Sequence, residues 1–229
     1  MKGFDRNIKF SLMWLKKISI YTYGTAILFE LWFWVLGVSE IHTVKDFCMN
    51  YIEYSVTVGC MFIFVYTAAN MVTVFDQIVS YGCTRKCAAL GMVCTNILVV
   101  LFQIAVNAAV YAIFSMIFGG SRLNAGMIMT YINSYLVIAA ISPLAALAVY
   151  EWGKIGYYII VVGSCGGFGG LMGVLIGNAE DGNSVMLSLM TDKFASVSLN
   201  LIIMPIAVAA IILTAFLLVK ATARSEVKG

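Results

Sequence analysis

The sequence predicts an all-α integral membrane protein with one transmembrane domain over residues 1–229. Hydrophobic residues make up 62% of the chain and charged residues only 11%, against about 45–50% and about 25% in ordinary soluble domains. Six apolar stretches also reach the ~20 residues that a helix needs to cross a bilayer core of about 30 Å. A transmembrane β-barrel would need segments that alternate apolar and polar residues, which these stretches do not. The six predicted spans cover residues 18–38, 52–75, 90–118, 125–149, 156–177 and 199–219.

The residues before the first span predict an amphipathic helix lying in the membrane interface. Phe4, Ile8, Leu12 and Leu15 recur at helical spacing, with charged residues between them. A disordered basic leader is the alternative. A cleaved signal peptide is disfavoured, because the apolar run over 18–38 exceeds the usual length of about 7–15 residues and no small-residue cleavage site ends it.

The basic residues predict the orientation of the chain. Of the 14 Lys and Arg residues, all but Lys45, Arg122 and Lys193 fall on the side that holds both termini and the loop after the second span. Short loops rich in Lys and Arg stay in the cytoplasm. We therefore expect cytoplasmic termini, and a cytoplasmic loop that contains Arg85.

No soluble domain and no catalytic constellation is predicted. The longest outer loop has only ~20 residues, too few for a nucleotide-binding module or a periplasmic domain. The single histidine, His42, lacks a second ligand nearby, and the six cysteines do not have the spacing of a closed zinc site. We expect no enzyme activity, no catalytic residue and no metal or other cofactor in this chain.

The fifth span is crowded with glycines at four-residue spacing. A phosphate-binding loop is excluded, since no Lys-Ser or Lys-Thr follows and the dinucleotide spacing is unmet. Small faces of this kind let two membrane helices approach closely, whereas a flexible or broken helix is the alternative. The residues predicted to form the packing face are Gly163, Gly166, Gly167, Gly170 and Gly173.

Polar residues at membrane depth are costly, and they mark a candidate pathway or a set of interhelical hydrogen bonds. Glu30 lies well inside the first span, while Gln103 and Asn107 share one face of the third. A pathway-lining role is plausible for these three. Pro143 and Pro205 each remove a backbone donor inside a span and predict kinks in the fourth and sixth helices.

The segment Asp76 to Gly91 breaks the apolar sequence between the second and third spans. Asp76 is a candidate helix N-cap, and Ile78, Val79 and Tyr81 form a short apolar turn that ends at Gly82. Thr84, Arg85 and Lys86 then lead into the third span. The segment predicts a short helix lying across the cytoplasmic face, with an ordinary positively charged loop as the alternative.

This motif, Gly-x-Thr-Arg-Lys after a short hydrophobic turn, resembles that of the ABC-2-type permeases of bacterial ABC transporters. The layout of six spans, a basic amphipathic N-terminal helix and no fused ATPase is similar over nearly the whole chain, although the motif itself covers only Gly82 to Lys86 and the approach to them. The resemblance implies that the segment is a coupling helix that docks on an ATPase subunit. Its contact residues would be Asp76, Ile78, Val79, Tyr81, Gly82, Thr84, Arg85 and Lys86.

The resemblance further implies a bacterial plasma-membrane exporter that works as a dimer, with a second copy or a sister permease. ATP and Mg would bind only in separate ABC ATPase subunits, and the other expected partner is membrane lipid, with no nucleic acid. The absence of a large outer domain favours an amphipathic peptide, lipid-like or drug-like cargo. A self-contained channel or secondary carrier is the alternative function.

Overall fold

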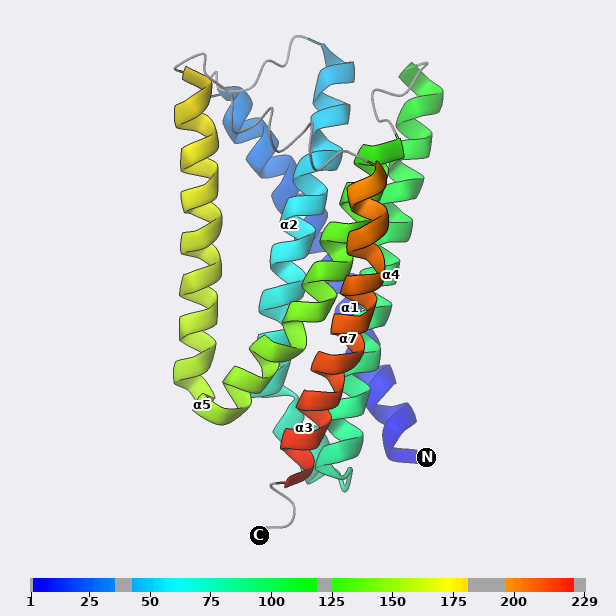
Figure 1. Cartoon of the computed structure of the whole chain (residues 1–229), viewed down its shortest axis with the longest axis vertical. Helices are drawn as coiled ribbons and strands as arrows, with labels where there is room; N and C mark the ends of the chain where they lie inside the picture. The colour runs from blue at the N-terminus through cyan, green and yellow to red at the C-terminus, as the bar shows by residue number, and fades with distance from the viewer. Residues whose placement is uncertain (1, 36–42, 119–124, 181–196, 225–229) are drawn as a thin grey trace.

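The computed structural model describes residues 2–35, 43–118, 125–180 and 197–224, and over these ranges the chain is helical with no strand. The helices form an elongated bundle (Figure 1). Their bounds are α1 (Lys2–Val35), α2 (Val44–Thr73), α3 (Phe75–Ser80), α4 (Arg85–Phe118), α5 (Ala125–Glu180) and α7 (Val197–Arg224).

Four helical stretches within the described residues are long and apolar enough to cross a membrane. They are Tyr54–Thr73, Arg85–Phe118, Ile128–Ser164 and Leu199–Arg224. The predicted all-helical class is confirmed over the described residues, and these four helices agree with a membrane protein. The count of six spans and the interfacial role of the first residues stay predictions.

The helix α5 is a hairpin of two helical arms joined at Gly153. This residue has φ 60° and ψ −137°, the only non-helical backbone angles within α5, and a side chain at positive φ would be costly where glycine is not. Figure 1 shows the first arm descending to the reversal and the second arm rising from it. The reversal therefore comes from Gly153 and not from Pro143, which lies ten residues earlier inside the first arm.

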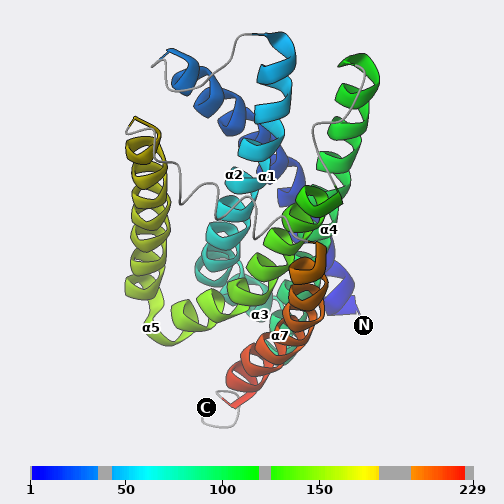
Figure 2. The same cartoon turned by 45° about the horizontal axis from the view of Figure 1, so that its top comes forward.

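Helix α2 occupies the centre of the packing. It contacts α1, α4 and α5, while α7 packs on α5 and α4. The second arm of α5 stands to one side of the bundle in both views (Figures 1 and 2), and Ile155, Tyr158 and Val162 on it are more than half exposed. The first arm therefore belongs to the bundle, whereas the lower part of the second arm offers much of its surface to the surroundings.

Small side chains let the helices approach closely at the core. One apolar cluster joins four fully buried alanines with residues of α3 and α7. The alanines are Ala68, Ala88, Ala89 and Ala146. A second cluster lies around Ile63, Val99 and Tyr135. In lipid, where apolar contact gains no water release, such close van der Waals packing holds helices together.

The beginning of α1, the end of α7, α3 and the reversal of α5 all lie at one end of the bundle (Figure 1). This arrangement agrees with the prediction that both termini and the Arg85 loop share one side. The orientation of that end relative to a membrane stays a prediction.

Candidate functional site

The predicted coupling segment forms the short helix α3, which follows α2 after a single residue, Val74. Val74 is the N-cap and makes no side-chain capping bond, and Asp76 lies in the first turn. The expectation that Asp76 caps this helix is therefore wrong. The carboxylate of Asp76 still lies near the helix N-terminus, where a negative charge is favourable.

One face of α3 is buried in the bundle and the other is exposed. Phe75 and Ile78 are 2% and 7% exposed and belong to the core cluster around Ala68 and Ala88. Asp76, Gln77, Ser80 and Tyr81 are exposed, Tyr81 to 73%. Ile78 therefore packs within its own chain and does not present a surface to a partner, and Val79 also packs partly against the core. The face of α3 that a partner could contact does not include Ile78, contrary to the prediction from the sequence, but does include Gln77 and Ser80.

The turn after α3 is fixed by two residues of the predicted motif. Gly82 has φ 85°, a conformation that glycine adopts without strain, and its N–H donates to the Val79 carbonyl at 3.0 Å. The Thr84 hydroxyl accepts a hydrogen bond from the Cys87 N–H at 3.2 Å and so caps α4, as threonine commonly does. Gly82 and Thr84 thus shape the turn itself.

Arg85 ties this turn to the first arm of α5. Its guanidinium donates to the Tyr150 hydroxyl at 3.3 Å, and the Tyr150 ring meets Phe75 edge-on at 5.7 Å between centroids. Lys86 is exposed. Arg85 therefore contributes to the anchoring of α3, whereas Lys86 is available to a partner or to lipid phosphates.

A cavity of about 250 Å³ lies between the α2–α3 junction and the reversal of α5. Phe75, Tyr150 and Gly153 line it, and Asp76 and Lys154 contribute charged side chains of opposite sign. Burial chiefly, and a hydrogen bond with Cys87 next, raise the pKa of the Cys83 thiol in the same turn to about 11. Cys83, which is 8% exposed and belongs to the core cluster around Ala68, is therefore an unreactive packing residue.

The candidate pathway residue Asn107 lies in a buried polar cluster that joins three helices. The Ser55 hydroxyl on α2 donates to Asn107 Oδ1 at 2.9 Å. Asn107 Nδ2 donates to the Tyr135 hydroxyl on α5 at 2.7 Å. Asn107 therefore uses both ends of its amide to hold helices together, as buried polar groups in a bilayer must find partners.

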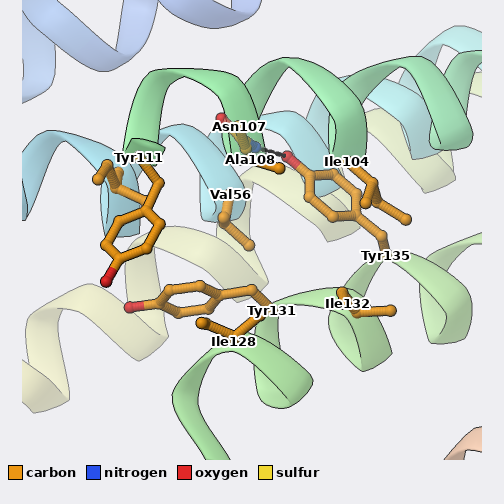
Figure 3. Close-up of a pocket in the computed structure, with 10 residues that line it drawn as sticks. Val56, Ile104, Asn107, Ala108, Tyr111, Ile128, Tyr131, Ile132 and Tyr135 are labelled. Atoms are coloured by element: carbon orange, nitrogen blue, oxygen red, sulfur yellow. Dashed lines mark hydrogen bonds between the residues drawn. The ribbon is translucent and has the colours of Figure 1, made fainter. Parts of the chain in front are cut away.

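An apolar pocket of about 80 Å³ lies beside this bond, and Figure 3 shows the residues that line it. Asn107 and Tyr135 meet at one side of the pocket, and the hydroxyl ends of Tyr111 and Tyr131 lie together at the opposite side (Figure 3). The remaining lining is mostly aliphatic, from Val56, Ile104 and Ile132. A volume of this size holds a few small groups or waters but no peptide.

Gln103, the second candidate pathway residue, is fully buried, and only the oxygen of its side-chain amide has a hydrogen-bond partner. The Tyr23 hydroxyl on α1 donates to Gln103 Oε1 at 2.8 Å, while Gln103 Nε2 has no partner. Two turns earlier on α4, the Asn96 side chain accepts a hydrogen bond from the Thr67 hydroxyl at 3.1 Å and donates one to the Ser142 hydroxyl at 2.6 Å. Sequence reasoning missed Asn96, although its spacing of seven residues from Gln103 places it on the same face of α4.

A third polar cluster joins α5 to α7. Asn133 Nδ2 donates to Asn200 Oδ1 at 2.8 Å, and Asn200 Nδ2 donates to Thr130 at 3.0 Å. Both asparagines border a cavity of about 420 Å³, largely apolar, between α2, α5 and α7. The polar residues of the described bundle are thus mostly paired across helices, which favours the interhelical role over a continuous open path.

Glu30 differs from the amides, because it is 0% exposed and neither carboxylate oxygen has a hydrogen-bond partner. Tyr51 and Cys48 of α2 lie close enough to interact electrostatically with it. Glu30 therefore differs from Gln103 and Asn107, with which the sequence grouped it, because those two make hydrogen bonds to other helices and Glu30 makes none.

The glycines predicted to pack lie in the second arm of α5. A methyl group at Gly163 or Gly166 would meet no atom within 4 Å, so neither packs against another part of this chain. For Gly167, Gly170 and Gly173 the structure describes the helical backbone but not its surroundings. His42 lies outside the described residues, and the side chains that are described contain no cluster of three metal-ligating groups.

Comparison of the chain with models of protein families, with curated proteins and with solved structures found no match.

Proposed function

We propose that this chain is the transmembrane subunit of an ATP-driven ABC exporter of the ABC-2 type. It works in a bacterial plasma membrane as a dimer with separate ATP-binding subunits, with both termini in the cytoplasm. The observation that carries the proposal is α3, a short helix inserted between two membrane-length helices with one face exposed. Such a helix can transmit force from a docked subunit because it is fixed to the bundle on its other face.

The fixing contacts support this role. Phe75 and Ile78 are buried, Arg85 bonds to Tyr150, and Gly82 and Thr84 define the turn. A push on the exposed side of α3 would therefore move the ends of α2 and α4 together with the first arm of α5. The exposed residues Gln77 and Tyr81 are the best contact points for an ATPase.

The two arms of α5 support the six-span layout. Each arm coincides with a predicted span, 125–149 or 156–177, and the reversal at Gly153 lies between them. Together with α1, α2, α4 and α7 they would give six crossings. The exposed arm that carries Gly163 and Gly166 is the face we assign to a second permease copy, because small residues permit close helix approach there.

An amphipathic peptide, lipid-like or drug-like molecule fits this bundle best as cargo. The cavity beside Asn133 and Asn200 is mainly apolar with a few polar groups, which is the usual composition of a small-molecule site. Gln103 and Asn107 would reach cargo only after their present interhelical bonds separate.

The experiment is co-purification of an affinity-tagged chain from membranes of the native cell. An ATP-binding protein should be recovered with the unaltered chain and lost from the double variant Gln77→Glu with Tyr81→Glu, because two new charges would disrupt docking. The matched control is Arg224→Gln, an exposed charge at the same end of the bundle, which should keep the complex. Retention of the complex by the double variant would contradict the proposal.

A self-contained channel or secondary carrier is the second candidate, favoured by the unpartnered carboxyl group of Glu30. Purified chain reconstituted in vesicles without any ATPase separates the two. Transport under those conditions would support the carrier and exclude a strict need for ATP.

A further inference from the structure

The carboxyl group of Glu30 is the least satisfied polar group among the described residues. It is 0% exposed, and both of its oxygens lack a hydrogen-bond partner. The other buried groups without a partner are single atoms of residues that are uncharged, namely Thr22, Gln103 and Asn133. A buried polar group without partners needs an explanation.

An ionised carboxylate in this position would be far more costly than a neutral acid. Burying an ionised carboxylate carries a large desolvation cost, and the usual compensation is a paired cation or several hydrogen-bond donors. Glu30 has neither in this conformation. The group avoids most of this cost when it binds a proton.

Among the described side chains, no basic group interacts electrostatically with Glu30, and Lys45, which lies one turn before Cys48 on α2, does not do so either. On α2, the neighbours that interact with it are Cys48 and Tyr51. On its own helix Tyr23 lies two turns away, with its hydroxyl committed to Gln103. On α4, the other helix packed against α1, Tyr111 is the only ionisable residue after Cys94. None of these tyrosine and cysteine side chains can carry a positive charge.

We propose that Glu30 is a proton-exchange site, which holds a proton in this closed conformation and releases it when the bundle opens water to α1. The proton leaves to water and the carboxylate forms, so that a change of shape is coupled to one proton. This inference does not depend on an ATPase and would stand in either proposed function.

The protonation state can be measured directly by infrared difference spectroscopy on the full chain in lipid bilayers. The carbonyl stretch of a protonated carboxylic acid should be present at neutral pH in the unaltered chain, should shift in heavy water, and should be lost in Glu30→Gln. Glu30→Gln keeps the shape of the neutral acid and is expected to fold at least as stably. The control Glu151→Gln removes an exposed carboxylate and should leave the band unchanged.

The proposal also requires that the band depends on conformation. Raising the pH should remove it together with a change in tryptophan fluorescence, since Trp32 and Trp34 lie beside Glu30 in the sequence, and Glu30→Gln should abolish that fluorescence change. Identical spectra of the unaltered chain and Glu30→Gln at neutral pH would overturn the proposal, because Glu30 would then be ionised in the closed state. A band that persists at all pH values at which the protein stays folded would also overturn it, since the proton would not exchange.

Discussion

Gly59 of α2 faces Tyr135 of α5 so closely that a methyl group at position 59 would lie 2.6 Å from the Tyr135 hydroxyl oxygen. That hydroxyl is held by Asn107 at 2.7 Å, and Tyr135 is 1% exposed. The ring has no room to retreat without breaking the bond. The absence of a side chain at Gly59 is therefore what allows the polar cluster of three helices to form.

We expect Gly59→Ala to destabilise the bundle by about 1–3 kcal/mol, the usual cost of overpacking a buried site. The measurement is thermal or detergent-induced unfolding of the purified chain. Gly24→Ala is the matched control, because a methyl group at Gly24 of α1 meets nothing within 4 Å and alanine favours a helix. Equal stability of the two variants would show that the contact with Tyr135 is not restrictive.

The bond between Asn107 and Tyr135 should appear as a coupling energy in a double-mutant cycle. Asn107→Ala and Tyr135→Phe each remove one partner, so their combined effect should fall short of the sum by about 0.6–1.7 kcal/mol, the range for hydrogen bonds between membrane helices. Unfolding in mixed micelles supplies the four stabilities.

Ser164→Ala is the control for that cycle, because its hydroxyl bonds only to the Val161 carbonyl of its own helix. Paired with Asn107→Ala, it should give additive effects. Full additivity of Asn107→Ala and Tyr135→Phe would mean that the two side chains do not stabilise the bundle through each other.

The reversal of α5 should be sensitive to Gly156. A methyl group there would lie 2.7 Å from the Ala148 carbonyl oxygen and 3.1 Å from Trp152 Cβ, and a backbone atom cannot move aside as a flexible side chain can. We predict that Gly156→Ala opens the angle between the two arms and lowers stability by about 1–3 kcal/mol.

Distances between spin labels on the two arms, measured in lipid, would report the change of angle. Gly163→Ala should leave those distances as they are, because that position meets no atom within 4 Å. An unchanged distance in Gly156→Ala would show that the close approach to Ala148 does not set the angle.

The sequence predicted the turn after α3 better than it predicted the buried polar contacts of the bundle. Local signals were sufficient for the turn: Gly82 ends the short helix and Thr84 begins the next one, as turn and capping preferences indicate. The burial of Ile78 was not predictable, because periodicity over six residues does not say whether an apolar face meets its own bundle or a partner.

For the interior, the sequence located Gln103 and Asn107 on one face of α4 but did not identify their partners. Tyr23, Ser55 and Tyr135 come from three other helices, and only packing brings them within hydrogen-bond distance. Asn96 belongs to the same face and was overlooked, although the seven-residue spacing was available as a signal. The importance of Gly59 could not be predicted from the residues around it in the sequence, because its role is to leave space for Tyr135 of another helix.

The sequence by itself determined the helical class, the position of the apolar stretches long enough to cross a membrane, and the break between the second and third of them. Hydrophobic length and turn chemistry are local properties of the chain. Only the tertiary structure decided that Gly153 reverses α5, that the amides of α4 bond across helices, and that Glu30 is buried without a partner. These are relations between helices distant in the chain, and they depend on which side chains the packing brings together and which it leaves alone.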